Sequence, residues 1–591
     1  MLGEALIKLA RIKPNIRKRQ IDLELGLFDN KLPSLLKRIY LGRQIFREEE
    51  LDRSLASLFL PNSLKGLEES MELLEAALEQ QQRVLIVGDF DTDGATSTAL
   101  AMLALRAMGM KYVDFIVPNR FEFGYGLTPE IVDIAKQRNP DLIITVDNGI
   151  SSIEGVIAAK EAEIKVLITD HHLPGPQLPA ADAILNPNQH GCDFPCKNLA
   201  GVGVVFYLLS ALRKRLRETG WFECNNIVPP NMAEWLDLVA LGTVADVAPL
   251  DHTNRILVHQ GVLRIRSGRS RPGLQALLAL AGKDPQKLVA TDLGFTVGPR
   301  LNAAGRLDDM SIGIACLLEN DPSTARGYAL QLDQLNLDRR KIEAGMQEEG
   351  IAILNHLEMD QKSLPWGLCL FDSNWHQGVI GLLASRIKDR VHRPVIIFAD
   401  AGGDDNTKEY KGSARSIPGL HIRDALEAVA TNHPELISKF GGHAMAAGLS
   451  IKAKDYSAFS EAFDLEVRRQ LTPSDLEVEV FVDGELTPEE LSLQTGLLIR
   501  ESGPWGQQFP EPLFQGTFYV ASQRIVAEKH LKLLLSVDSR HRQLIDAIAF
   551  NVDMDSWPDG KKEKVQIVYK MDINFWQGRE SLQLIVESFI L

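Results

Sequence analysis

The sequence has few cysteines, no long apolar run and no low-complexity tract, and each absence excludes a class of protein. Five cysteines in 591 residues are too few for a disulfide-stabilised secreted scaffold and fit a reducing compartment. Cys192 and Cys196 could form half of a zinc site, but no second Cys or His pair lies at finger spacing. No apolar run approaches the roughly 18 residues of a membrane span, and the basic N-terminal stretch lacks the pattern of a signal peptide.

An excess of positive charge is also missing. Lys and Arg number 64 against 79 Asp and Glu, so the formal net charge is −15 at pH 7. Taken alone, this argues against a nucleic-acid-binding protein, because the phosphate backbone attracts basic surfaces. A local basic channel is still compatible with it, and metal cations held by clustered carboxylates would supply positive charge. The negative net charge therefore does not exclude a nucleic acid as the substrate.

The chain does have length and clear apolar patterning. It is 45% hydrophobic and 24% charged, and its length predicts about three or four domains. Short apolar runs alternate with helix-like stretches in the first part, which indicates a parallel sheet covered on both faces. The expected strands are residues 84–88, 114–117, 142–146 and 165–169. The expected helices are residues 94–109, 129–138 and 152–163.

Three further regions follow this alternation. Residues 323–358 contain no proline and are rich in Leu, Gln, Glu and Arg, which predicts one long helix joining two lobes. After residue 365 the alternation restarts, with helices expected at 378–389 and 421–430, and this indicates a second α/β unit. From residue 475 alternating segments predict an all-β barrel or sandwich of about five or six strands.

Acidic side chains and imidazoles stand where the apolar runs end. Ligands bind outside the carboxyl ends of the strands in open parallel α/β sheets, so we expect these side chains to converge at one edge. One of them lies in "LGTVADV", which we interpret as a further site of the same kind. The candidates are Asp89, Asp91, Asp93, Asp147, Asp170, His171, His172 and Asp246.

Clustered carboxylates imply cations. Acidic groups close together must be protonated, paired or bound to a cation. Oxygen ligands with one or two imidazoles suit Mn²⁺ or Mg²⁺, although imidazole also admits Zn²⁺ or Fe²⁺. The ligands exceed what one ion needs, which favours two ions that share a bridging carboxylate and promote phosphoryl displacement. A single Asp at a strand end is more often a helix cap or turn residue, but four such places together favour metal binding.

Several motifs resemble those of a known family. Four of them are similar to the motifs of the DHH phosphoesterase superfamily: "DFDTDG" (89–94), "VDNG" (146–149), "DHH" (170–172) and "GTVADV" (242–247). Longer stretches resemble the bacterial single-stranded-DNA-specific 5′→3′ exonucleases of that superfamily: "NRFEFGYGL" (119–127), "GPRLNAAGR" (298–306), "GSARS" (412–416) and "GGHAMAAG" (441–448). The resemblance covers residues 80–450, and the β module follows in the expected place.

The resemblance implies the domain organisation of an α/β protein with a terminal β domain. A DHH domain with a parallel sheet is joined by a long helix to a smaller α/β DHHA1 domain, and an all-β OB fold follows. The expected boundaries are 1–60 for an N-terminal extension, 61–325 for the DHH domain, 326–360 for the helix, 361–470 for the DHHA1 domain and 471–591 for the OB fold.

The resemblance also implies a ligand set for two ions, Mn²⁺ or Mg²⁺. Asp91 and Asp93 are expected to bind the two separate ions, and Asp147 to bridge them. His171 and Asp246 are expected to complete the ligands of the second ion.

Four neighbouring residues have other expected roles. Asp89 is expected to ligate or orient, and His172 to lie beside the bridging water and the scissile phosphate. Asp170 is expected to hold a histidine in its ligating tautomer. Val87 stands where many members of the superfamily have a histidine, so the first ion would have fewer protein ligands and could arrive with the substrate.

Substrate contacts are expected in two parts of the first α/β region. Arg120 suits a phosphate contact and Tyr125 a stacked base, although Tyr125 could equally be a packed loop aromatic. By resemblance, Arg300 and Asn302 face the active-site cleft. Arg306 could instead form a surface ion pair.

The second α/β region offers a candidate site for the 5′ end of the strand. Ser413, Arg415 and Ser416 lie in "KGSARS", where hydroxyls, guanidinium and backbone N–H groups would cradle a phosphate. His443 lies in a Gly-rich turn that resembles a substrate-binding motif of the superfamily, with a structural role as the alternative.

The hypothesis is a metal-dependent exonuclease that degrades single-stranded DNA in the 5′→3′ direction to 5′-mononucleotides, in DNA repair and recombination. We expect a monomer in the bacterial cytoplasm, and the resemblance implies a single-stranded-DNA-binding protein and a helicase as partners. Two alternatives are a DHH phosphodiesterase acting on short RNA or cyclic dinucleotides, and a non-catalytic single-strand-binding scaffold. The intact acidic residues disfavour the scaffold.

Overall fold

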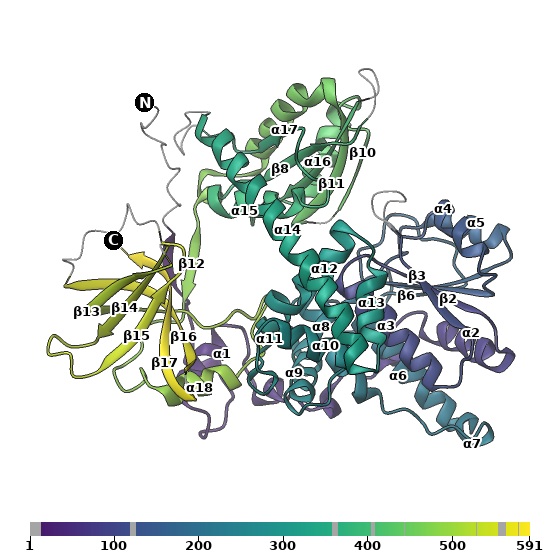
Figure 1. Ribbon diagram of the computed structural model, residues 1–591, viewed down its shortest axis with the longest axis horizontal. Coiled ribbons are helices and arrows are strands. Elements are labelled where there is room, and N and C mark those ends of the chain that lie inside the picture. The colour runs from purple at the N-terminus through teal and green to yellow at the C-terminus, as the bar shows by residue number, and fades with distance from the viewer. Residues whose placement is uncertain are drawn as a thin grey trace. The chain divides into compact units, whose positions relative to one another are not determined.

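The computed structural model (Figure 1) describes residues 14–118, 126–356, 364–402, 408–442, 444–527, 529–552, 563–576 and 578–590. The chain divides into two compact units, one formed mainly by residues 334–480 and the other by residues 18–333 together with residues 481–591. Within the described part of the chain, no helix combines the length and the apolar character that crossing a bilayer requires.

A five-stranded sheet forms the centre of the first α/β region. Its order is β3-β2-β4-β5-β6, and every neighbouring pair is parallel. The all-apolar strands β2 and β4 are buried along their whole length, as a sheet with both faces covered requires. The bounds are β2 (Val84–Gly88), β3 (Val113–Ile116), β4 (Leu142–Val146), β5 (Lys165–Thr169) and β6 (Ala183–Leu185). The sequence predicted the first four within one residue and missed β6.

Helices cover both faces of this sheet (Figure 1). On one face α4 and α5 bury apolar side chains such as Ile131 and Val156 against Val87 and Val166 of the strands. On the other face α3 and α6 pack against β2 and β4. The bounds are α2 (Leu67–Gln80), α3 (Thr92–Ala107), α4 (Pro129–Lys136), α5 (Ile153–Glu161) and α6 (Gly201–Glu218).

A helical region follows the sheet along the chain. Its central helix α8 is almost fully buried and packs against α3, α6 and α9. The bounds are α7 (Trp221–Cys224), α8 (Leu236–Ala245), α9 (His252–Arg266), α10 (Pro272–Leu280), α11 (Ala290–Asp292), the π-helix η7 (Leu293–Val297), α12 (Gly298–Leu307) and α13 (Ser311–Leu318). The predicted long helix is α14 (Pro322–His356). It begins at a proline, which is common at the first position of a helix because the N–H group there has no partner within the helix.

The second α/β region contains a mixed five-stranded sheet of order β10-β11-β9-β8-β7. Only β7 and β8 are parallel. Phe398, Phe459 and Phe463 form its aromatic core. The bounds are β7 (Leu368–Phe371), α15 (Ile380–Val391), β8 (Val395–Asp400), β9 (Glu409–Arg415), α16 (Ile422–Asn432), β10 (Lys439–Gly442), β11 (Ala446–Lys452) and α17 (Tyr456–Gln470).

The C-terminal strands close into the predicted barrel, in the order β13-β14-β15-β17-β16. Phe514, Phe518 and Tyr569 pack together as buried side chains of this module. The bounds are β13 (Phe514–Val526), β14 (His530–Ser536), β15 (Leu544–Ala549), β16 (Lys564–Trp576) and β17 (Arg579–Ile590). Before the barrel come α18 (Leu493–Glu501) and β12 (Glu479–Val482), which pairs with β1 (Asn15–Lys18), the strand that precedes α1 (Ser34–Leu41).

The five cysteines are all free thiols. Cys196 is buried, and its thiol donates to Asp251 Oδ2 at 3.0 Å. Burial, followed by the Asp251 charge, raises the pKa of the Cys196 thiol far above its usual value, which opposes the thiolate form that zinc requires. Among the described residues, the groups arranged like metal ligands contain only Asp and His, so Cys192 and Cys196 are not part of such a group.

Candidate metal centre

The parallel register brings the ends of three strands to one level. Gly88 of β2 pairs with Val146 of β4, and Val146 pairs with Thr169 of β5. The residues that follow directly are Asp89, Asp147 and the segment 170–172. These side chains therefore meet at the carboxyl edge of the sheet, as the sequence predicted.

The start of α3 adds two carboxylates. Asp91 is the N-cap residue, and its Oδ1 accepts the N–H of Gly94 at 3.0 Å. A Cβ at Gly94 would lie 2.5 Å from the Asp89 carbonyl oxygen, so only glycine allows the chain to turn this tightly from strand to helix. The turn places Asp93 one residue into the helix, where it is 1% exposed.

A second helix holds the carboxylate of Asp93. The N–H groups of Gly201 and Val202, at the start of α6, donate to Asp93 Oδ2 and Oδ1 at 2.6 and 3.0 Å. The positive end of the α6 dipole favours negative charge at this point. Both oxygens of Asp93 are thereby fixed in orientation.

Asp246 comes from a helix and not from a strand end, which corrects the sequence interpretation. It is the C-cap residue of α8 (Leu236–Ala245). Negative charge at a helix C-terminus is unfavourable, because the last carbonyl groups already carry partial negative charge. A bound cation would remove this penalty.

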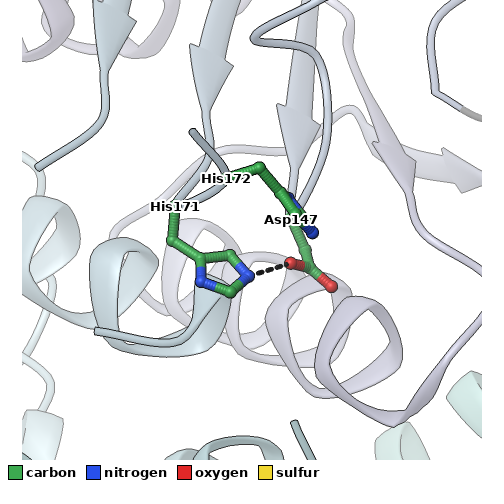
Figure 2. A group of neighbouring side chains, drawn as sticks. All are labelled: Asp147, His171 and His172. Atoms are coloured by element: carbon green, nitrogen blue, oxygen red, sulfur yellow. Dashed lines mark ion pairs between the residues drawn. The ribbon is translucent and has the colours of Figure 1, made fainter. Parts of the chain in front are cut away.

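The imidazole of His171 lies among three of these carboxylates. Its Nε2 is 3.0 Å from Asp147 Oδ1, 3.9 Å from Asp93 Oδ2 and 4.0 Å from Asp246 Oδ2. Figure 2 shows His171 pointing toward Asp147, with His172 following it in the chain. The two imidazole rings have centroids 4.4 Å apart.

Three overlapping groups of these side chains have the spacing of metal ligands. In each group the ligand atoms lie within 4.8 Å of one another. Asp147 and His171 each belong to two of the groups, so they link the three groups into one cluster. The groups are Asp89, Asp91 and Asp147; Asp93, His171 and Asp246; and Asp147, His171 and His172.

Electrostatics give a second reason to expect cations here. Burial, and then the neighbouring Asp91, raises the pKa of Asp93 to about 7. Burial and the other carboxylates, Asp93 first, raise the pKa values of Asp147 and Asp246 well above the usual range. These acids are costly to ionise in the metal-free protein, and divalent cations would stabilise their ionised forms. The donor set and its charge therefore fit a pair of hard divalent cations.

His172 and Asp170 form a pair beside the cluster. His172 Nδ1 lies 2.7 Å from Asp170 Oδ1, and Asp170 is fully buried. Burial lowers the pKa of His172, but Asp170, together with the charges of Asp89 and Asp246, outweighs burial and raises that pKa to about 9. Burial raises the pKa of Asp170, but His172, His171 and the hydrogen bond from the Ile150 N–H together outweigh burial and bring that pKa to about 2. In the metal-free protein these two pKa values favour an imidazolium held by a carboxylate. Asp170 thus orients His172, and its other oxygen accepts the N–H of Ile150.

Val87 lies away from the cluster. It is fully buried in the apolar core between the sheet and helices α4 and α5. The group of Asp89, Asp91 and Asp147 therefore has oxygen ligands only, which Mn²⁺ and Mg²⁺ accept.

Sequence reasoning missed two glycines that line the centre. A Cβ at Gly201 would lie 2.7 Å from Asp147 Cβ, and a Cβ at Gly242 would lie 2.8 Å from Asp93 Oδ1. Asp147 itself has φ +62°, a conformation that Asp tolerates better than most residues. Only the packing of α6 and α8 against the strand ends reveals that these positions must lack a side chain.

The predicted substrate residues on α12 are engaged within the protein. Arg300 is 9% exposed, and its guanidinium donates to Asp333 Oδ1 at 2.8 Å and to the Thr296 carbonyl at 2.6 Å. Asn302 Oδ1 accepts the N–H and hydroxyl of Thr92, at the start of α3. These contacts tie α12 to the metal centre. Arg306 is half-buried at the end of the same helix.

In the second α/β region, Ser413 and Arg415 lie on β9 against the start of α15. Arg415 Nη1 donates to Ser413 Oγ at 3.1 Å, and a Cβ at Gly381 would lie 2.7 Å from Arg415 Nη2. The serine hydroxyl, the guanidinium and the helix N-terminus thus adjoin. Ser416 is instead 1% exposed, and its hydroxyl donates to the Leu420 carbonyl. Three predicted substrate residues, Arg120, Tyr125 and His443, lie outside the described residues.

Comparisons with known proteins agree with this architecture. Three family models match the chain: the DHH family N-terminal domain at 83–243, the DHHA1 domain at 366–469 and the RecJ OB domain at 482–588. The predicted fold class, a DHH domain, a DHHA1 domain and an OB fold, is confirmed. The curated single-stranded-DNA-specific exonuclease RecJ of Escherichia coli K12 is 53% identical over 97% of this chain and 98% of its own length.

Two solved structures are also similar. The crystal structure of RecJ with Mn²⁺ from Thermus thermophilus has a TM-score of 0.76 and 30% identity, over 96% of this chain and 76% of that chain. The structure of RecJ with Mg²⁺ from the same organism has a TM-score of 0.71 and 28% identity, over 96% of this chain and 75% of that chain.

Proposed function

The chain belongs to the RecJ family of DHH-domain proteins, and we propose from this membership that it is an exonuclease specific for single-stranded DNA. The observation that carries the proposal is the convergence of five carboxylates and His171 at one edge of the sheet, with the spacing of metal ligands. The cofactor is Mn²⁺ or Mg²⁺, the ions in the similar RecJ structures. Two ions supply Lewis acidity that activates water and stabilises charge on the phosphoryl oxygens.

The side chains of the centre then have distinct tasks. Asp89, Asp91 and Asp147 would hold one ion, and Asp93, His171 and Asp246 the other. Asp147 would be close to both sets, because its Oδ1 lies 3.0 Å from His171 Nε2. The α6 N-terminus orients Asp93.

His172 acts on the phosphate and not as a primary ligand. Its Nδ1 lies 2.7 Å from Asp170 Oδ1, and this contact helps to raise the pKa of the imidazole, which favours its cationic form. We assign its ring a hydrogen bond to a phosphoryl oxygen, where it would stabilise the negative charge that develops in the transition state.

The direction of digestion, from the 5′ end to 5′-mononucleotides, depends on where the strand end is held. We assign the 5′ phosphate to Ser413 and Arg415 beside the start of α15, where a guanidinium, a hydroxyl and a helix N-terminus adjoin. Arg120, Tyr125, Arg306 and His443 remain proposed substrate contacts from the resemblance. Ser416, Arg300 and Asn302 support these elements through the bonds described above.

The cellular setting follows from family membership. We propose a monomer that acts in DNA repair and recombination in the bacterial cytoplasm, with a single-stranded-DNA-binding protein and a helicase as partners. The proposed domain boundaries are those given from the sequence. The three matched family regions fall inside the proposed DHH, DHHA1 and OB segments.

A digestion of end-labelled single strands tests the function. With Mn²⁺, a 5′ label is expected to appear at once as mononucleotide, whereas a 3′ label stays in a shortening ladder. Asp147→Ala is expected to abolish cleavage and to spare most DNA binding. Dinucleotides degraded faster than long strands would support the short-substrate alternative. Cleavage that persists in Asp147→Ala would refute the bridging role.

A further inference from the structure

One aromatic side chain near the metal centre is almost fully exposed to solvent. Phe295, in the middle of the π-helix η7, is 80% exposed, whereas its neighbours Leu293, Thr296 and Val297 are buried. The next most exposed phenylalanine within the described residues, Phe550, is 49% exposed. Burying a phenylalanine stabilises a protein by about 1.5–3 kcal/mol, and Phe295 forgoes most of this. A ligand that covers the ring would recover it.

The π-helix lies directly against the helix that carries Asp246. A Cβ at Gly294 would lie 3.1 Å from Val244 Cγ1, and a Cβ at Gly298 would lie 3.2 Å from Ala245 Cβ. These contacts, one helical turn and one peptide unit limit the distance between the α-carbons of Phe295 and Asp246 to about 15 Å. That distance corresponds to roughly four stacked nucleotides at about 3.4 Å each.

A second exposed apolar side chain, Val247, directly follows Asp246 in the chain. Val247 is 61% exposed and has φ +59°, a strained conformation for a β-branched residue. It directly follows Asp246, the C-cap residue of α8, at a position where glycine or asparagine is usual. Two large apolar side chains, Val247 and Phe295, are thus presented to solvent from packed elements beside the centre.

The backbone segment that carries Phe295 is held by hydrogen bonds to neighbouring helices. Arg300 donates to the Thr296 carbonyl at 2.6 Å and to Asp333 at 2.8 Å, which fixes the π-helix to α12 and α14. Short π-helical segments occur frequently at functional sites. The backbone that carries the ring is therefore already ordered before a flat ligand covers it.

We propose that Phe295 stacks on an unpaired base of the DNA strand near the scissile phosphate and so favours single strands over duplex. The proposal rests on the function proposed above. An unpaired base in a single strand has a free face, and an aromatic ring stacks on any of the four bases. In a duplex the neighbouring pairs cover both faces of each base, so the same contact would require unstacking.

Steady-state digestion of single strands by Phe295→Ala provides the first test. Base–aromatic stacking predicts that KM rises by about fivefold to a hundredfold, whereas Phe295→Trp stays within about threefold of the wild type. Tyr112→Ala is the matched control, because Tyr112 is 55% exposed and precedes β3, at the opposite, amino end of the strands. We expect no change in KM for the control. An unchanged KM for Phe295→Ala, or no recovery with Trp, would overturn the proposal.

An abasic scan separates stacking from a general loss of affinity. A single abasic site is moved through the first six nucleotides, and binding is measured by anisotropy in chelator, where the strand stays intact. The wild type is expected to bind one of these strands about fivefold or more weakly than the others, and Phe295→Ala to bind them all alike. An equal penalty in both proteins refutes stacking. Binding that depends on Phe295 without any cleavage by the wild type would instead count against the proposed nuclease function.

Discussion

When divalent cations are removed with a chelator, we expect the free energy of unfolding of the metal-free protein to fall as the pH rises from 4 to 7. The cause is Asp93, whose pKa rises from 3.8 to about 7 through burial and the neighbouring Asp91. A carboxyl with a raised pKa in the folded state retains a proton that the unfolded chain releases. Its contribution is therefore fully present below pH 3.8 and is lost as the pH rises through about 7.

The magnitude follows from the size of this shift. Three pH units at about 1.4 kcal/mol each amount to at most about 4 kcal/mol for Asp93. A domain of about 150–250 residues changes its melting temperature by about 2–4 °C per kcal/mol, so we expect a loss of about 10 °C between pH 4 and 7 for the domain that contains Asp93. Mn²⁺ at a hundredfold excess over its dissociation constant is expected to restore about 2.7 kcal/mol at pH 7 and less at pH 5, where protons compete.

Thermal unfolding by circular dichroism between pH 4.5 and 8, with chelator and with Mn²⁺, measures these effects. Asp93→Asn is expected to flatten the pH dependence and to lose most of the Mn²⁺ stabilisation. Asp237→Asn is the control, because Asp237 is also a buried carboxylate with a raised pKa but lies outside the metal-ligand groups. It should keep the full response to Mn²⁺. Equal stabilisation of Asp93→Asn and the wild type by Mn²⁺ would refute the reasoning.

Three further substitutions test separate parts of the site. Gly201→Ala places a methyl group 2.7 Å from Asp147 Cβ and should weaken Mn²⁺ binding at least tenfold by calorimetry, whereas Gly203→Ala, which meets only the Leu199 side chain, should not. Asp170→Asn removes the charge that holds His172 protonated, so kcat should fall about 10–100-fold and the pH–rate profile should shift to lower pH; an unshifted profile would contradict this role. Arg415→Lys should raise KM about tenfold or more for strands with a 5′ phosphate and little for strands with a 5′ hydroxyl, and an equal effect on both would exclude the phosphate contact.

Much of the site could be predicted from local sequence. Asp89 and Asp147 directly follow apolar runs, and His171 comes one residue after the end of another. Because the strands are parallel and in register, these side chains converge at one edge of the sheet. The fold class was predictable for the same reason, because short apolar runs and stretches of helical period alternate along the chain. The fifth strand, β6, was not, because its three residues give too little pattern.

Other features depend on elements that are distant in the chain. Asp246 lies at a helix end, the N–H groups of the α6 N-terminus donate to Asp93, and Arg300 forms an ion pair with Asp333. All three features depend on tertiary packing that no local sequence pattern predicts. For Phe295, the local sequence predicts burial and the structure shows exposure. Its sequence context, "LGFTV", is typical of a buried segment, and only the structure places the ring in solvent.

The sequence by itself determined which chemical groups are available and which strand ends carry them, because strand formation and parallel pairing depend on short apolar patterns. Tertiary structure alone decided which helices close over those ends, which glycines must leave room and which arginine is engaged internally. The physical reason is that the stability of a buried charge depends on the groups around it in space. Those groups come from α6, α8 and α14, which are far along the chain from the aspartates at the strand ends.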